Sequence, residues 1–106
     1  MTERTINAIM ISPIDDVATV ITELTEGDRA VFLKNGEITQ VPILGTIPQY
    51  HKLAIRDLKR NEPLKKYGEI MGQATQDIVQ GSHVHDHNVT SPELTTEGDK
   101  NEVLGI

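Results

Sequence analysis

The sequence contains no cysteine, and it is poor in aromatic residues, basic residues and long apolar runs. Without cysteine the chain has no disulfide, no thiolate metal ligand and no thiol nucleophile, which fits a reducing cytoplasm. The aromatic residues are Phe32, Tyr50 and Tyr67, and 10 Lys and Arg residues stand against 16 Asp and Glu residues. Base stacking and phosphate neutralisation require aromatic and clustered basic side chains, so the composition argues against a nucleic-acid partner.

Long apolar segments are also missing. No stretch approaches the roughly 20 residues that a membrane helix requires. The start of the chain, MTERTINAIMISP, lacks the apolar core and the cleavage site of a signal peptide. We therefore expect a cytoplasmic protein with no membrane contact, and 106 residues suffice for one domain with a modest core.

The residues that are present form short β-rich segments separated by turn signals. The segment KNGE at 34–37 is typical of a hairpin, because Asn-Gly tolerates the positive φ angles of a type I′ turn. Pro42 suits an edge strand or a strand end. The expected strands, which are rich in Val, Ile and Thr or follow turn signals, are residues 6–11, 17–24, 30–33 and 38–44.

A short pattern occurs three times, at residues 23–30, 57–64 and 77–84. Each copy has a Glu or Asp, an aliphatic residue, a Gly or Asn that accepts a left-handed turn conformation, and the start of a new strand. The unequal spacing of 34 and then 20 residues argues against a solenoid. These units predict a small, mainly β single domain at residues 1–89, followed by a polar C-terminal tail or linker at 90–106.

Three of the four histidines lie in the segment GSHVHDHN at 81–88, at every second position. In a strand, His83, His85 and His87 would share one face, and Asp86 would point the other way. Imidazole is the commonest metal ligand and suits Fe²⁺, Mn²⁺ and Zn²⁺. The spacing therefore indicates a metal or catalytic site, and the alternative is an edge strand with solvated histidines.

Four stretches resemble the small N-terminal domain of the altronate/galactarate dehydratase family, which is an SAF-like β-clip domain. They are DDVA at 15–18, YHKLA at 50–54, YGEIMG at 67–72 and VHDHN at 84–88. The resemblance extends over residues 6–89. This chain departs from the family pattern in having Asp16 for Asn, Tyr50 for Gly and Asp86 for Thr. It also ends before the large catalytic domain that the dehydratases carry.

The resemblance implies a lyase that removes water or sulfite from a hydroxylated carboxylate, with help from a divalent metal such as iron or manganese. Proton removal beside a carboxylate places negative charge on the carboxylate oxygens, which a metal stabilises. His85 and His87 are then expected to be catalytic residues and metal ligands, and Asn88 is expected to contact the substrate. His83 has no counterpart in the family pattern and is expected to be an ordinary exposed side chain, and the alternative is that it joins the cluster, because it shares the same face. For Asn88 the alternative is a plain turn residue.

The resemblance also implies roles for residues outside this segment. His51 and Lys52 are expected to receive the substrate carboxylate, with a solvated strand start as the alternative. Asp15 is expected to contact a substrate hydroxyl or to support a metal, whereas for Asp16 we favour an Asx-type turn after Pro13. A solvated basic patch is expected from Lys59, Arg60, Lys65 and Lys66, and the alternative is that it steers an anionic substrate toward the site.

Three functions compete at this point. The first is the small subunit or N-terminal domain of a sugar-acid dehydratase, or of a sulfolactate sulfo-lyase, sharing its metal and its active site with a larger catalytic chain. The second is a non-enzymatic module that binds sugar acids. The third is an assembly module that pairs its edge strands in a homo-oligomer. We expect no turnover by the chain alone, because it has few convergent acid and base groups and little concave volume.

Overall fold

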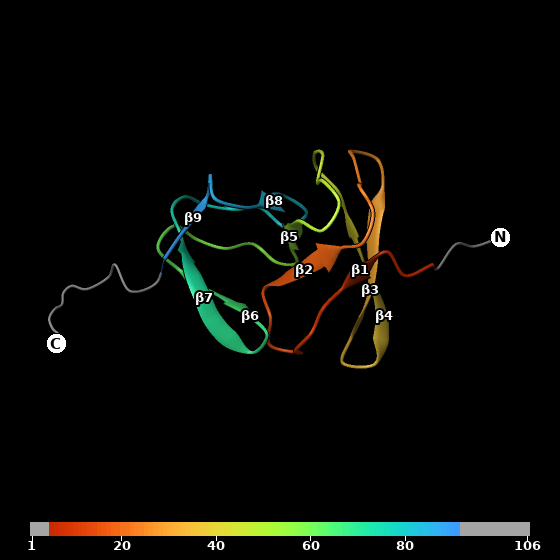
Figure 1. Cartoon of the computed structure of the whole chain (residues 1–106), viewed down its shortest axis with the longest axis horizontal. Coiled ribbons are helices and arrows are strands. Elements are labelled where there is room, and N and C mark those ends of the chain that lie inside the picture. The colour runs from red at the N-terminus through yellow and green to blue at the C-terminus, as the bar shows by residue number, and fades with distance from the viewer. Residues whose placement is uncertain (1–4, 92–106) are drawn as a thin grey trace, which may run out of the picture.

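The computed structural model describes residues 5–91, which form strands, turns and loops without a helix, and this confirms the prediction of a small, mainly β domain. In Figure 1 the β3–β4 hairpin and the β6–β7 hairpin lie on opposite sides of the central strands β2 and β5. Within the described range, no helix is long and apolar enough to cross a membrane. The strands are β1 (Ala8–Ile9), β2 (Val17–Val20), β3 (Arg29–Lys34), β4 (Glu37–Pro42), β5 (Lys52–Ala54), β6 (Pro63–Lys66), β7 (Glu69–Ala74), β8 (His83–Val84) and β9 (Val89–Thr90).

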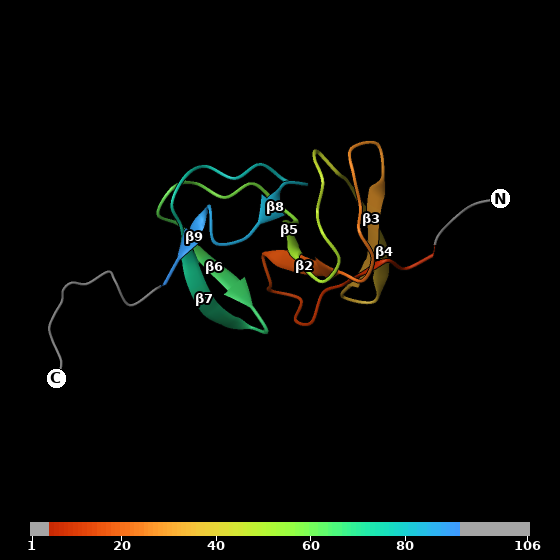
Figure 2. The ribbon, with the colours of Figure 1, turned by 45° about the horizontal axis from the view of Figure 1, so that its top comes forward.

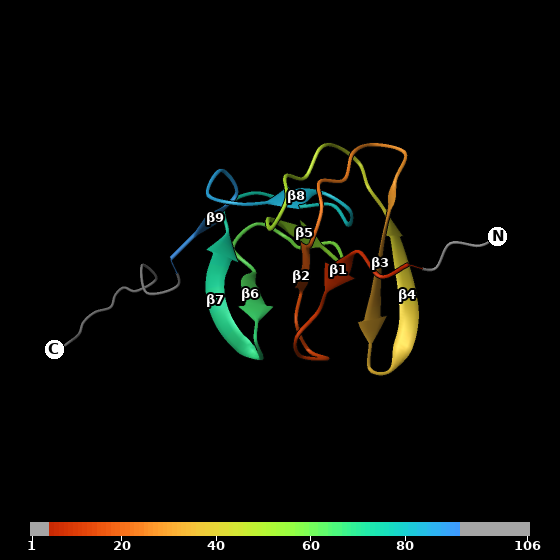
Figure 3. The same ribbon diagram turned by 45° about the vertical axis from the view of Figure 1, so that its right-hand side comes forward.

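All strand pairs in the three sheets are antiparallel. The central sheet has the order β1-β2-β5-β8, and the two hairpins form the sheets β3-β4 and β6-β7-β9 (Figures 2 and 3). Strand β5 lies between β2 and β8, so that Lys52 is opposite both Thr19 and Val84. This register brings the chain around residue 51 beside the chain around residues 83–85.

Two apolar clusters hold the domain together, one under each hairpin. Side chains alternate across a strand, so neighbouring residues of β5 serve different clusters: Leu53 packs in the first and Ala54 in the second. Full burial of a Leu or Phe side chain stabilises the fold by about 1.5–3 kcal/mol. The largest fully buried side chains are Phe32, Ile47, Leu53, Leu58 and Leu64.

The sequence repeat is confirmed as a structural repeat, and the structure contains a fourth copy. Each copy closes a turn with a backbone hydrogen bond of 2.9–3.0 Å, and the turn residue has a positive φ angle. The fourth copy is TIPQYHKL at 46–53, which the sequence pattern missed because it has Thr at the acidic position and Tyr at the turn position. The four turn residues are Gly27 (φ 100°), Tyr50 (φ 69°), Asn61 (φ 73°) and Gly81 (φ 91°).

The copies pair with one another through their aliphatic residues. Leu24 pairs with Ile47, and Leu58 pairs with Ile78, in each case through two backbone hydrogen bonds of 2.7–3.0 Å. In the second pair the acidic residues bind the turn of the opposite copy. Asp57 accepts a hydrogen bond from the amide of Gln80 at 2.8 Å, and Asp77 accepts one from the amide of Arg60 at 2.9 Å. The acidic residues in these two copies therefore have a structural role.

The predicted hairpin turn at KNGE is confirmed. Asn35 and Gly36 have φ angles of 54° and 84°, and the pair of Lys34 and Glu37 closes the ladder. The second hairpin repeats this arrangement at KYGE, where Tyr67 and Gly68 have φ angles of 59° and 78°. The two halves of the domain are thus built from the same local elements.

Four expected strands are shorter than the sequence predicts, and the one expected at 38–44 ends at Pro42. Residues 6–11 contribute only β1, and the segment 17–24 is broken because β2 ends at Val20, where the fourth turn unit pairs with it. The predicted strand through residues 83–87 is wrong beyond Val84: residues 85–88 form a turn closed by a 3.1 Å hydrogen bond from the Asn88 amide to the His85 carbonyl. Strand β9 includes Thr90, and the predicted tail from residue 92 onward lies outside the described residues.

Candidate functional site

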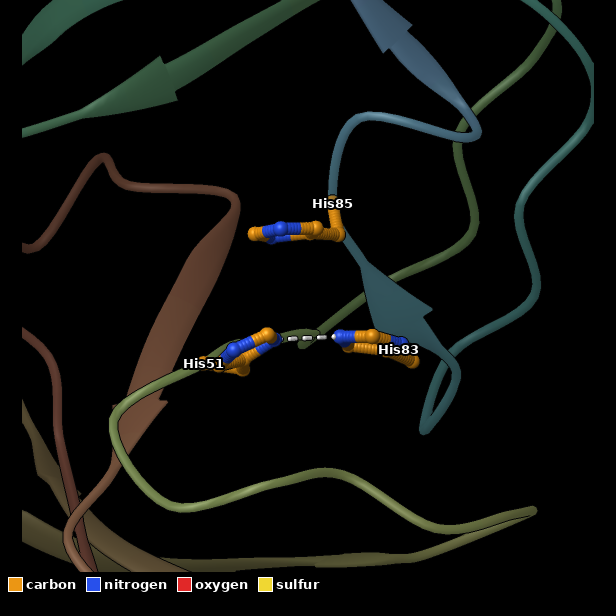
Figure 4. Close-up of side chains that lie close together, drawn as sticks. All are labelled: His51, His83 and His85. Carbon is orange, nitrogen blue, oxygen red and sulfur yellow. Dashed lines mark hydrogen bonds between the residues drawn. The ribbon is translucent and has the colours of Figure 1, made fainter.

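Three histidine rings converge where β5 meets β8, and we call His51, His83 and His85 the histidine cluster. His51 precedes β5, His83 begins β8 and His85 follows it. The His85 ring stacks on the His51 ring, with centroids 4.3 Å apart, and lies 5.5 Å from the His83 ring (Figure 4). The β5–β8 ladder therefore joins histidines that are 32 residues apart in the sequence.

Two rings of the cluster share a hydrogen bond. His51 Nδ1 and His83 Nε2 are 2.8 Å apart, so one ring donates its N–H and the other accepts with its lone pair. The pKa of His83 lies below its ordinary value, mainly because burial disfavours the charged ring and secondly because of positive charge on His51 and the neighbouring histidines. His83 is therefore biased toward neutral imidazole, the form that binds metals and accepts protons.

The histidine cluster fits a divalent metal by donor type and by spacing. Each residue offers one ring nitrogen, and the three nitrogens lie within 4.8 Å of one another. Metal–nitrogen distances are about 2.0–2.1 Å, so two ligands of one ion lie at most about 4.2 Å apart. The rings lie at 12–33° to one another, so they would have to rotate before their in-plane lone pairs could point at one ion. Three protein ligands leave further positions for water or substrate.

His87, predicted as a ligand and catalytic residue together with His85, lies outside the converging group. Its side chain is exposed and its ring centroid is 5.3 Å from that of His83. The expectation that His83 is an ordinary exposed side chain is wrong, because His83 is half-buried and bonded to His51. The position of His87 arises from the turn at 85–88, which ends the alternation that a strand would impose, whereas His83 meets His51 through the pairing of β5 with β8. A role for His87 stays a prediction.

Asn88 is buried beneath this turn and holds its backbone. Its side-chain oxygen accepts a hydrogen bond from the His85 amide at 3.0 Å, and its side-chain nitrogen donates one to the His83 carbonyl at 2.9 Å. Asn88 thus fixes the backbone that carries two rings of the cluster. The geometry shows the turn role that the sequence left as an alternative, and a direct substrate contact stays a prediction.

Asp15 is buried and binds backbone amides at the tip of the second hairpin. Its carboxylate accepts hydrogen bonds from Tyr67 and Gly68 at 3.0 and 2.8 Å, and from Ser12 at 3.0 Å. Asp15 is not a member of the group whose ligand atoms converge. A contact with substrate stays a prediction, and what the structure shows is a clamp on the hairpin.

Asp16 does not form the expected Asx-type turn, and that prediction is wrong. Its buried carboxylate accepts hydrogen bonds from Arg56 Nε at 2.7 Å and from the Lys65 amide at 2.8 Å. Arg56 also contacts Glu62 at 2.8 Å. The pKa of Glu62 is lowered, first by the hydrogen bond from the Lys59 amide and then by the Arg56 guanidinium. Through its hydrogen bonds with Arg56 and with Lys65 of β6, Asp16 anchors β6 to the central strands.

Two cavities open beside the histidine cluster. The first, of about 310 Å³, includes Lys52, Lys66 and His85 in its wall. The second, of about 330 Å³, includes His83 and His87 together with apolar side chains such as Val79. Small molecules can therefore reach the cluster from two sides. Of the residues expected to receive a carboxylate, the structure places Lys52 in the first cavity and His51 within the cluster itself.

Known proteins with similar sequences differ greatly in length. The chain is 38% identical to the (2R)-sulfolactate sulfo-lyase subunit alpha of Chromohalobacter salexigens, over 71% of this chain and 83% of that subunit. It is 31% identical to the altronate dehydratase of Bacillus subtilis and 35% identical to that of Escherichia coli, over 70% and 76% of this chain. These matches span only 14% and 15% of the two dehydratases.

The match to a family model covers the described domain almost completely. Residues 6–92 match the altronate/galactarate dehydratase SAF domain, which agrees with the resemblance seen in the four sequence stretches. The all-strand structure is consistent with this assignment. The chain therefore belongs to the altronate/galactarate dehydratase SAF domain family.

Proposed function

We propose that this chain is the small subunit, or the N-terminal domain, of a lyase that acts on a hydroxylated carboxylate. A larger catalytic chain would complete the active site. The matched relatives support this proposal, since they are dehydratases and a sulfo-lyase subunit that contain the same domain. The match to the sulfo-lyase subunit alpha keeps loss of sulfite as the second candidate reaction.

The observation that carries the proposal is the convergence of His51, His83 and His85 beside a cavity that contains Lys52. The Lys52 ammonium would bind the substrate carboxylate through charge-assisted hydrogen bonds. A neutral ring of the cluster that is not bound to a metal would take the proton from the adjacent carbon, or return a proton to the departing group. Asn88 would act as a positioning residue, because it holds the backbone of two of these histidines.

The histidine cluster is also the proposed holder of a divalent metal, iron or manganese, in place of the His85 and His87 pair expected from the sequence. When bound, such a metal supplies positive charge that stabilises the carboxylate oxygens as the carbon proton leaves. Only a ring nitrogen without a proton binds, so the ring that donates the hydrogen bond between His51 and His83 would carry its proton on its other nitrogen in the metal-bound form.

Reconstitution with a large catalytic chain tests the proposed reaction. The two chains would be co-expressed and assayed with altronate, galactarate and (2R)-sulfolactate. His85→Ala should lower turnover of the accepted substrate by about 100-fold or more, because general acid–base groups contribute about 10²–10⁴-fold. His87→Ala is the matched control. Unchanged turnover in the His51, His83 and His85 variants would refute the proposed site.

Metal binding by the chain alone distinguishes the cluster from the pair predicted by sequence. In equilibrium dialysis or Mn²⁺ titration followed by electron paramagnetic resonance, His83→Ala should weaken binding by about tenfold or more, as loss of a ligand requires. His87→Ala should leave the affinity within about twofold. The reverse ranking would restore the His85 and His87 pair.

A further inference from the structure

The first cavity beside the cluster has an unusual distribution of charge, and we call it the lysine cavity. Its volume of about 310 Å³ is near the lower end of the range for small-molecule sites. Lys52 and Lys66 line it from different strands, β5 and β6, and Asp86 is the one carboxylate in its wall. The wall therefore carries a surplus of positive charge even when His85 is neutral.

Lys66 is held at this cavity without an acidic partner. It is the last residue of β6, and Asp15 fixes the turn that follows by accepting the amides of Tyr67 and Gly68. The Lys66 Nζ atom lies 3.5 Å from the centre of the Tyr67 ring. Glu69 is opposite Lys66 in the ladder, yet within residues 5–91 the two form no ion pair. The ammonium group can therefore bind an anion without breaking a salt bridge.

Lys52, like Lys66, has no acidic partner within the described residues. It is half-buried and directly follows His51. Partly buried ammonium groups interact with anions more strongly than fully solvated ones, because water screens them less. Both lysines line one small cavity, which suits a ligand with negative charge at both ends.

We propose that Lys66 forms a second anion subsite, so that the lysine cavity selects hydroxy acids with two anionic groups over those with one. This inference rests on the proposed function. Lys52 binds the carboxylate beside the carbon that faces the histidines, and Lys66 binds the carboxylate or sulfonate at the other end. The ligand class is thus a hydroxy dicarboxylate or a hydroxy carboxylate with a sulfonate, and Lys66 is a residue that determines specificity.

The test is a titration of the full chain, free of metal and at low salt, with malate and with lactate, followed by NMR of the lysine and histidine side chains. These two hydroxy acids differ in the second carboxylate. Malate should bind about fivefold more tightly than lactate, which corresponds to one partly exposed ion pair. Lys66→Gln should remove this difference while leaving lactate binding unchanged. Lys59→Gln, which changes an exposed lysine outside the cavity wall, is the matched control and should preserve the difference.

Several results would overturn the inference: equal affinities for the two acids, no detectable binding of malate, or the same loss in Lys66→Gln and Lys59→Gln. The last result would mean that net charge alone attracts the anion. The titration needs no metal and no partner chain. A malate preference that depends on Lys66, together with an inactive reconstituted complex, would therefore reject the lyase function and retain the subsite.

Discussion

The aspartate clamp (Asp15 and Asp16) and the histidine cluster are both polar groups in protected positions, but they differ in how fully the fold satisfies them. Each buried carboxylate receives at least two hydrogen bonds from amides or from Arg56. In the cluster, only His51 Nδ1 and His83 Nε2 take part in a hydrogen bond within residues 5–91. The clamp is therefore architectural, whereas the cluster retains ring nitrogens for a ligand.

This difference predicts opposite responses to mutation. Removal of a buried carboxylate that accepts several hydrogen bonds leaves the donors without partners. The lost hydrogen bonds lower the free energy of unfolding. Removal of a half-buried imidazole leaves few groups unsatisfied, and the loss appears in metal binding or turnover. The sequence motifs contain both kinds of residue side by side, so only the hydrogen-bond partners separate them.

The largest expected effect on stability is that of Asp16→Ala. The variant should lose about 2–3 kcal/mol of unfolding free energy, because the Lys65 amide and the Arg56 guanidinium lose their acceptor; the exposure of Arg56 keeps the loss below that of a fully buried pair. Urea denaturation measures this loss. Asp16→Asn keeps one oxygen acceptor and should lose less. A loss below about 0.5 kcal/mol in Asp16→Ala would mean that the clamp is not structural.

Asn88→Ala should have an intermediate effect on stability. Both polar atoms of the Asn88 side chain are hydrogen-bonded, like those of the aspartates, but this side chain holds the backbone of the histidine cluster. The loss of two hydrogen bonds to the turn should lower stability by about 1–2 kcal/mol and weaken metal binding, although Asn88 is not one of the proposed ligands. Hydrogen exchange at the His85 amide reports the turn directly. Fast exchange with unchanged metal affinity would show that the turn does not position the rings.

The smallest expected effect is on the pH dependence of stability. The pKa of His83 is lowered in the folded state, so folding favours its neutral ring. Its contribution to stability is complete above the unfolded value of about 6.5 and is lost as pH falls through the lower folded value. His83→Gln should therefore flatten the stability profile just below neutral pH. Urea midpoints at several pH values measure this slope.

The control for this effect is a second group with a lowered pKa. Glu62 stabilises the fold above its unfolded value of about 4.3, and that stabilisation is lost as pH falls further. Glu62→Gln should change the profile near pH 4 and leave the region around pH 6 intact. An unchanged slope near pH 6 in His83→Gln would contradict the assignment to His83.

Local signals in the sequence predicted the hairpin at 34–37 and three of the four turn units, because Asn-Gly and Gly turns depend on neighbouring residues. The fourth unit escaped because Tyr50 occupies a positive φ angle that favours Gly or Asn. The strand predicted through His87 failed for a local reason of another kind. The Asn88 side chain bonds the backbone of His83 and His85 and so competes with strand extension.

The composition of the cluster could not be predicted from spacing. His51 and His83 meet through the pairing of β5 with β8, and a single sequence does not reveal which strands are neighbours. The resemblance supplied His51 and Lys52 as site residues and His85 as a ligand. The assignment of Asp16 to a turn failed because its partners, Arg56 and Lys65, are 40 and 49 residues away.

The domain consists of two halves with matching turns and hairpins, and the histidines come from both. His51 closes the first half, while His83 and His85 follow the last turn of the second. An ion or molecule bound across them would stabilise the folded domain by mass action and slow hydrogen exchange in β5 and β8, where the two halves meet. Because of the duplicated construction, one ligand at the histidine cluster would contact both halves of the domain.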